Sequence, residues 1–260
     1  MTDIALTRGV SARLADCELT YLQRAPIDID LARRQHAAYE ALLASLGYEV
    51  VPLPRLDEQP DAVFVEDAGI ALDEVAIVAP MGAPSRAGES ASVAEALVQY
   101  LPLLRLTSPA TLDGGDVLRA DRRLFVGRSQ RTNGAATDEL TKLLAPYGYE
   151  VMPVDVSGAL HLKSACAFLG GDAMLVNPEW IDVTPLAGFE LVPCDASEPW
   201  GASALLAGGV LVMATGFPRT TGALRDRGLD VREIDLSELR KAEGGPTCLS
   251  ILLKAPTAAP

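Results

Sequence analysis

Five positions spread along the sequence carry or border residues that could do chemistry, and each stands just before a short apolar segment. In chain order they are Glu66 with Asp67, Asp113, His161, Gly201 and Cys248. They recur at separations of 40 to 48 residues, a period typical of radial or stacked repeats. Equivalent positions in a closed radial array converge on its axis. A cysteine, one of only two histidines and three carboxylates would then meet at one end of one channel, as covalent catalysis requires.

Cys248, His161 and Asp113 are the strongest candidates for direct roles in such chemistry. A cysteine that opens an apolar strand is usually a small buried hydrophobic residue, and we keep that interpretation for Cys166. Cys248 differs because it follows a Gly-Gly-Pro turn, whose backbone can approach a ligand closely. A histidine flanked by leucines, as His161 is, more often belongs to a core, and Asp113-Gly-Gly-Asp also fits a simple tight turn. Their alignment by the repeat favours catalysis.

Charged residues around these positions could hold an ionic ligand. Asp61 and Asp67 have even spacing along one predicted strand and share a face, whereas Glu66 lies on the opposite face. Carboxylates beside an apolar strand need partners, because an unpaired buried charge is costly. Arg86 and Arg131, in loops just after outer strands, could fork onto a carboxylate.

A repeated pair of elements positions all these residues. The phrase at 47–52, Gly-Tyr-Glu-Val-Val-Pro, returns at 148–153, with fainter copies from Gly188 and Gly228. Each copy predicts a glycine followed by a strand. A strand-turn-strand follows each copy, at 68–72 with 75–78, 117–118 with 124–127, 165–169 with 173–176, and 202–206 with 210–213.

A fifth unit at 249–253 lacks its outer strand. We expect residues 4–9, which resemble 124–129, to supply it, so that the two chain ends pair and close the ring without an open sheet edge.

Helices are predicted at 30–46, 90–101, 137–144 and 219–227. The second carries an apolar stripe formed by Val93, Leu97, Val98 and Leu101. We expect this stripe to pack on the sheets. Because no linker rich in Gly, Ser or Pro divides the chain, residues 1–254 are expected to form a single domain, with 255–260 as a disordered tail.

Composition excludes several function classes. The 260 residues carry a net charge of −13 without a basic cluster, which argues against nucleic-acid binding and which we interpret mainly as solubility. No apolar run reaches the ~18 residues of a membrane span, and the N-terminus lacks a signal-peptide core. The four cysteines include no Cys-x-x-Cys pair and there are two histidines, so we expect no metal site and a reduced, cytoplasmic protein.

The chain resembles the dimethylarginine dimethylaminohydrolases of the guanidino-group-modifying (pentein) superfamily, over essentially its whole length. The matching motifs are Pro60-Asp-Ala-Val-Phe-Val-Glu-Asp, Gly82-Ala-Pro-Ser-Arg, Leu112-Asp-Gly-Gly-Asp, Arg131-Thr-Asn, Leu160-His-Leu-Lys-Ser, Gly216-Phe-Pro-Arg-Thr and Gly245-Pro-Thr-Cys. The resemblance implies an α/β fold, a five-bladed α/β propeller with pseudo-five-fold ββαβ-type repeats around a central channel.

The resemblance also implies catalytic roles. Cys248 would be the nucleophile and His161 the general acid and base, with Asp113 orienting the histidine. Asp67 would hold the guanidinium nitrogens, and Glu66 would support the site. Asp113 stands where some members of the family have glutamate, which shortens the reach to the histidine.

The amino-acid end of a substrate would be bound by a second set of residues. Arg86 and Arg131 would clamp its α-carboxylate, and Asp61 with the backbone carbonyl of Ala242 would bind its α-amino group. Leu19 falls where the family has a mobile lid leucine.

The implied activity is hydrolysis of Nω-methylated arginine to citrulline and a methylamine, through a covalent cysteine adduct and without metal or organic cofactor. The expected partner is a small-molecule guanidine, not nucleic acid or membrane, and the protein could form a homodimer. An arginine deiminase or an amidinotransferase is the nearest alternative. A non-catalytic propeller binding protein is an alternative of a different class, which retention of Cys248 and His161 disfavours.

Overall fold

Fifteen strands dominate the computed structural model, which describes residues 2–255. In chain order they are β1 (Ile4–Arg8), β2 (Glu49–Leu53), β3 (Ile70–Ala71), β4 (Ala76–Val78), β5 (Leu103–Arg105), β6 (Val117–Ala120), β7 (Arg123–Arg128), β8 (Glu150–Asp155), β9 (Cys166–Gly170), β10 (Ala173–Val176), β11 (Glu190–Pro193), β12 (Ala204–Ala207), β13 (Val210–Ala214), β14 (Val231–Ile234) and β15 (Ser250–Leu253). Apart from Ala255, the expected disordered tail lies outside the described residues.

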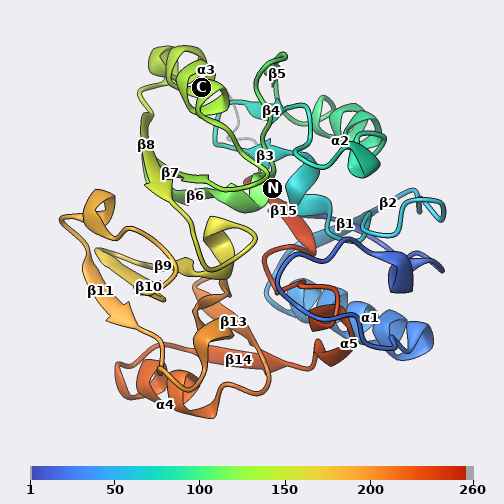
Figure 1. The fold of residues 1–260 in the computed structure, drawn as a ribbon, viewed down its shortest axis with the longest axis vertical. Coiled ribbons are helices and arrows are strands. Elements are labelled where there is room, and N and C mark those ends of the chain that lie inside the picture. Colours follow the sequence, from blue (N-terminus) through green and yellow to red (C-terminus); the bar gives the residue numbers. More distant parts are fainter. Residues whose placement is uncertain (1, 256–260) are drawn as a thin grey trace.

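These strands form five three-stranded sheets arranged around a central axis (Figure 1). In each sheet the middle strand pairs antiparallel with the strand nearest the axis and parallel with the outermost strand. The innermost strands meet around the axis, where β9 contacts both β6 and β12, and β15 contacts β3. The predicted five-bladed α/β propeller is confirmed.

The ring closes through the two ends of the chain. Strand β1 pairs antiparallel with β15, with Ile4 opposite Leu253, and parallel with β2, with Ile4 opposite Glu49. The first strand of the sequence thus completes the last blade, as the incomplete fifth repeat predicted. Closure leaves no blade without a neighbour, which protects the short sheet edges.

Helices on the outside of the ring connect the middle and outer strands of their blades, except the last one, which lies between β14 and β15 (Figure 1). They are α1 (Ile29–Ser45), α2 (Ser90–Leu97), α3 (Gly134–Leu144), α4 (Pro218–Asp226) and α5 (Ser237–Arg240). Asp28 caps α1 by accepting the Leu31 N–H, and Asn133 caps α3 by accepting the Ala136 N–H. Four blades therefore have the order ββαβ. The blade of β9, β10 and β11 has a short 3₁₀ helix, Thr184–Leu186, in place of the α-helix.

One helix prediction was wrong in its extent. Helix α2 ends at Leu97 instead of residue 101, and the Val98 side chain is 54 % exposed. Val93 and Leu97 are fully buried because residues four apart share a helix face. Val98 follows Leu97 by one position and is turned about 100° away from that face. Leu101, beyond the end of the helix, is partly buried and packs against the same core cluster as Val93 and Leu97, so Val98 is the member of the stripe that does not pack.

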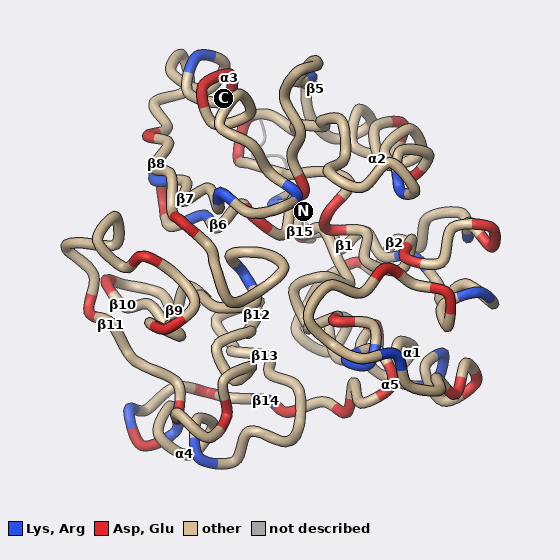
Figure 2. Tube along the Cα trace, viewed as in Figure 1, with Lys and Arg blue, Asp and Glu red and all other residues tan. Residues whose placement is uncertain are grey.

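Apolar layers between neighbouring blades form the core, whereas the axis itself carries polar groups. One such layer joins Leu6 of β1, Val78 of β4 and Leu97 of α2. Figure 2 shows acidic and basic residues interspersed over the helices and loops around the ring. Within residues 2–255, no helix has both the length and the apolar character needed to cross a membrane.

Candidate active site

The segments just before the innermost strands meet at one end of the axis. Short 3₁₀ helices at Val65–Ala68, Gly114–Asp116 and Leu162–Ser164 present Asp67, Asp113 and His161 there, and Cys248 stands before β15. A cavity of about 20 Å³ lies at this end. Seven of the predicted site residues are found at or next to it: Asp61, Asp67, Arg86, Arg131, His161, Ala242 and Cys248 line the cavity.

His161 is held between two carboxylates. Its Nε2 lies 3.2 Å from Asp113 Oδ2, and its Nδ1 lies 3.7 Å from Asp67 Oδ1. Burial alone lowers the pKa of His161, but the charge of Asp67 and the hydrogen bond to Asp113 outweigh it and raise the pKa to about 9. The imidazole therefore carries its second proton at neutral pH and can donate one.

Cys248 is a thiol under the same conditions. Its Sγ accepts a hydrogen bond from the Gly245 N–H at 3.3 Å. Burial, followed by the negative charges of Glu66 and Asp67, raises the pKa of Cys248 to about 12. The Tyr39 hydroxyl, from α1, donates to the Pro246 carbonyl at 2.8 Å and so fixes the turn that precedes the cysteine.

The two glycines of the Asp-Gly-Gly-Asp segment permit the close approach of three blades. A Cβ atom on Gly115 would lie 2.6 Å from His161 Nδ1 and 2.7 Å from Asp67 Oδ1. A Cβ on Gly114 would lie 2.1 Å from the Glu66 carbonyl oxygen. The segment is a turn, as its composition allows, but its glycines are needed to pack the histidine against the carboxylates.

Asp116, which sequence reasoning treated only as part of that turn, holds the histidine segment in place. It is fully buried, and its Oδ1 accepts the Leu162 N–H at 2.9 Å while its Oδ2 accepts the Ser129 hydroxyl at 2.6 Å. Burial raises the pKa of Asp116 to about 6. The sequence does contain a sign of this role: Asp116 is a second aspartate three residues after Asp113, which is the span of one 3₁₀ turn.

Arg86 is buried and fully engaged with carboxylates. Its Nη1 lies 2.6 Å from Asp67 Oδ2, and Glu89 accepts its Nε–H at 3.0 Å and an Nη2–H at 2.7 Å. The expected fork onto a carboxylate is therefore made, with Glu89 as the bidentate partner. Glu89 was missed by the sequence analysis, although its position three residues after Arg86 was visible.

Arg131 differs from Arg86 in having an uncommitted nitrogen. Its side chain is largely buried, its Nη1 is 4.0 Å from Asp113 Oδ2, and within residues 2–255 that Nη1 has no hydrogen-bond acceptor. An arginine nitrogen in this state beside a cavity can bind an anionic group of a ligand.

Asp61 also borders the cavity. It is buried, and its Oδ2 accepts the Glu18 N–H at 3.1 Å. Burial raises the pKa of Asp61 to about 6. Ala242 is buried beside it on the cavity wall.

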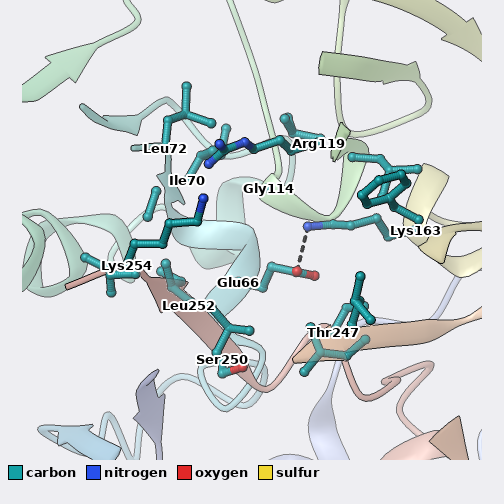
Figure 3. A pocket seen from close by; sticks show the side chains of 18 of the residues that line it. Glu66, Ile70, Leu72, Gly114, Arg119, Lys163, Thr247, Ser250, Leu252 and Lys254 are labelled. Atoms are coloured by element: carbon teal, nitrogen blue, oxygen red, sulfur yellow. Dashed lines mark hydrogen bonds and ion pairs between the residues drawn. The ribbon is translucent and has the colours of Figure 1, made fainter. Parts of the chain in front are cut away.

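Glu66 and Leu19 are not brought to the small cavity. The Glu66 carboxylate contacts Lys163 Nζ at 2.5 Å, and both residues line a separate cavity of about 380 Å³ (Figure 3). Figure 3 shows the two side chains pointing toward each other across that space, near Thr247 and Gly114. Leu19 packs half-buried against the core next to the site, and its neighbour Glu18 lines the small cavity instead.

Asp67, Asp113 and His161 could in principle ligate a metal ion, since their ligand atoms lie within 4.8 Å of one another. Both nitrogens of His161 already face carboxylates, and Asp67 also has Arg86 as its counter-ion. The protonated imidazole and Arg86 therefore balance the charges of the two carboxylates, and the arrangement fits acid and base chemistry.

Comparison with known proteins places this geometry in a family. The family described as "N,N dimethylarginine dimethylhydrolase, eukaryotic" matches residues 21–185. The N(G),N(G)-dimethylarginine dimethylaminohydrolase of Streptomyces coelicolor is 39 % identical over 253 residues, 96 % of each chain. The protein of the same name from Pseudomonas aeruginosa is 30 % identical, over 86 % of this chain and 89 % of its own length. The chain therefore belongs to the dimethylarginine dimethylaminohydrolase family.

Solved structures agree. A cysteine-to-serine mutant of the Pseudomonas aeruginosa protein, complexed with citrulline, superposes with a TM-score of 0.91 at 28 % identity, covering 97 % of this chain and 99 % of that chain. A histidine-to-glycine variant of a dimethylarginine dimethylaminohydrolase, as an adduct with S-methyl-L-thiocitrulline, gives the same TM-score and identity and covers 97 % of this chain and 100 % of its own. The N-terminal domain of ArgZ, a cyanobacterial arginine dihydrolase, shares the fold with a TM-score of 0.88 at 18 % identity, over 98 % of both chains.

Proposed function

We propose that this protein hydrolyses asymmetric dimethylarginine and monomethylarginine to citrulline and di- or monomethylamine. The observation that carries the proposal is the meeting of Cys248, His161 and Asp67 in one buried cavity of a protein of this family. The names of the relatives and the citrulline complex of one of them support the choice of substrate.

The reaction begins with a protonated histidine and a neutral thiol. Binding of the cationic guanidinium beside Asp67 favours release of the Cys248 proton to solvent, because the cation offsets the negative field around the sulfur and His161 is already protonated. The thiolate adds to the guanidinium carbon, and His161 gives its proton to the departing amine. The C–N bond breaks, and an S-alkylthiouronium adduct remains on the cysteine.

Hydrolysis of the adduct regenerates the enzyme. Neutral His161 now takes a proton from water, and the resulting hydroxide adds to the same carbon. The C–S bond then breaks with return of the electron pair to Cys248, the hydroxyl proton passes to the thiolate to restore the thiol, and citrulline is released. Asp113, hydrogen-bonded to His161, keeps the ring oriented through both steps.

Recognition of the amino-acid end falls to Arg131, Asp61 and the Ala242 carbonyl, with Arg86 as the second arginine. Arg86 is the counter-ion of Asp67, so a bound guanidinium would replace it there and leave its Nη1 free for the substrate carboxylate. Leu19 would act as the lid residue, and Glu66 would support the site from the neighbouring cavity.

Arg131→Ala should lower kcat/KM about 30- to 1000-fold and raise KM. This corresponds to a loss of ~2–4 kcal/mol of transition-state stabilisation, because a charge-assisted pair to the α-carboxylate is removed. Arg86→Ala should lower kcat/KM at least as much and should also destabilise the fold, since Glu89 would lose its buried bidentate partner and Asp67 would keep only His161 as a counter-charge. Steady-state kinetics and thermal unfolding measure both effects. Normal activity of both variants, with decarboxylated analogues reacting equally well, would refute the clamp.

A substrate panel tests the function. Citrulline and amine release should be measured with asymmetric dimethylarginine, monomethylarginine, arginine and agmatine. Preference for the methylated amino acids supports the proposal, whereas preference for arginine with ammonia release would identify an arginine deiminase. Transfer of the amidino group to an added amine would identify an amidinotransferase. Binding without turnover of any guanidine would favour a non-catalytic propeller.

The proposal includes a cytoplasmic location and a homodimer. All four cysteines are free thiols, which fits a reducing compartment. Light scattering coupled to size-exclusion chromatography would test the dimer.

A further inference from the structure

A short loop borders the catalytic cavity. Residues 18–22, here called the covering segment, contain neither helix nor strand and lie between the 3₁₀ helix Leu14–Asp16 and α1. Glu18 of this segment lines the cavity together with Cys248. The cavity beneath has room for about one water molecule and none for an amino acid. An amino acid can therefore enter only if part of the cavity wall moves, and the covering segment belongs to that wall.

Carboxylates at the site hold the backbone of this segment. The Oε1 atom of Glu243 accepts the N–H groups of Thr20, Tyr21 and Leu22, at 3.0, 2.6 and 2.7 Å. Three successive N–H groups that converge on one anionic oxygen form a strong anion-binding arrangement. Asp61 holds the other end of the segment through the Glu18 N–H.

Glu243 also belongs to the wall of the cavity. It stands between Ala242 and Gly244, and all three residues line the space around Cys248. Its φ is 60°, a left-handed conformation that costs a residue with a side chain roughly 1–2 kcal/mol. The residue with this unfavourable backbone conformation is therefore also the residue whose side chain binds the covering segment.

We propose that Glu243 is a positioning residue that latches the covering segment over the catalytic cavity. The bond between its Oε1 and the three N–H groups sets the closed state, and their separation opens the site. This proposal depends on the proposed function only for the identity of the enclosed substrate. A purely structural role for Glu243 would stabilise the fold without controlling access to Cys248.

The key variant is Glu243→Asn. Asparagine tolerates the left-handed backbone, but its shorter side chain cannot span to all three N–H groups. Glu243→Gln is the conservative variant, because it removes the same charge while an amide oxygen can still accept the hydrogen bonds. Glu233→Gln, on the exposed face of β14, is the matched control for loss of one carboxylate.

Two measurements need no turnover and so separate the latch from the proposed activity. Hydrogen exchange of the peptide containing residues 20–22 should be at least tenfold faster in Glu243→Asn than in wild type. Alkylation of Cys248 by neutral iodoacetamide should be at least fivefold faster. Glu243→Gln should lie close to wild type in exchange, which distinguishes the latch from a charge effect on the thiol, and Glu233→Gln should match wild type in both.

In an active preparation, Glu243→Asn should also raise KM for methylarginine at least fivefold. Unchanged exchange at residues 20–22 in a folded Glu243→Asn protein would overturn the proposal. If Glu243→Asn fails to fold, Glu243→Ser serves in its place. Failure of both to fold, with Glu243→Gln folded and wild-type-like in exchange and alkylation, would assign Glu243 to the fold and also overturn the latch.

Discussion

Cys248→Ser should lower turnover of methylarginine by at least about 10⁴-fold, because a serine hydroxyl remains protonated in a site that already holds the cysteine as a thiol. His161→Asn should lose a similar amount, since no other described side chain at the cavity is placed to protonate the departing amine. The two residues act in one sequence of steps. The double variant should therefore be barely worse than either single variant.

Citrulline release under single-turnover conditions, with enzyme in excess, measures these losses. Cys194→Ser is a suitable control, because Cys194 follows β11 and does not line the catalytic cavity. The control should keep wild-type kcat. Substantial turnover by Cys248→Ser would rule out covalent catalysis.

A small cationic amidine electrophile should alkylate Cys248 roughly 100-fold or more faster than a neutral haloacetamide of equal intrinsic reactivity. Burial and the charges of Glu66 and Asp67 raise the pKa of the thiol to about 12, and a cation next to them reverses that field. Each unit by which the pKa falls toward neutrality gives a tenfold larger thiolate fraction.

The cationic reagent should largely spare the other cysteines. Burial raises the pKa of Cys17 to about 11 and that of Cys166 to about 12, and it also raises the pKa of Cys194. Inactivation rates across pH and mass spectrometry of the modified peptide test the prediction. For the neutral reagent the rate should rise with pH beyond 9. A plateau near pH 7, or equal rates for both reagents, would show that substrate charge does not activate Cys248.

Much of the fold followed from one recurring phrase in the sequence. The repeat located the inner strands, and the incomplete unit at 249–253 predicted that residues 4–9 would close the ring, as the pairing of β1 with β15 confirms. The predicted strand through Val63 is wrong, because residues 61–63 form a turn and Val65–Ala68 form a 3₁₀ helix. The even spacing of Asp61 and Asp67 is therefore not what brings them to one cavity. Glu66, on the opposite face of that segment, points into a different cavity.

What could not be predicted depends on loops and on three-dimensional partners. Glu89 binds Arg86 because a 3₁₀ turn at Pro84–Arg86 brings them together, and no periodic pattern marks such a turn. The contact of Glu243 with the covering segment joins positions more than 200 residues apart. Helix α5 has only four residues, too few for a hydrophobic period.

The central claim, attack of Cys248 on the substrate carbon, is tested most directly by mass spectrometry of acid-quenched His161→Asn enzyme mixed with S-methyl-L-thiocitrulline. A thiolate leaving group needs no proton from the histidine, whereas release of the adduct needs a base to activate water. The account predicts stoichiometric modification of the Cys248 peptide, with a mass increase equal to the reagent less methanethiol, that decays far more slowly than in wild type. Citrulline formation at an undiminished rate with the Cys248 peptide unmodified throughout would contradict it.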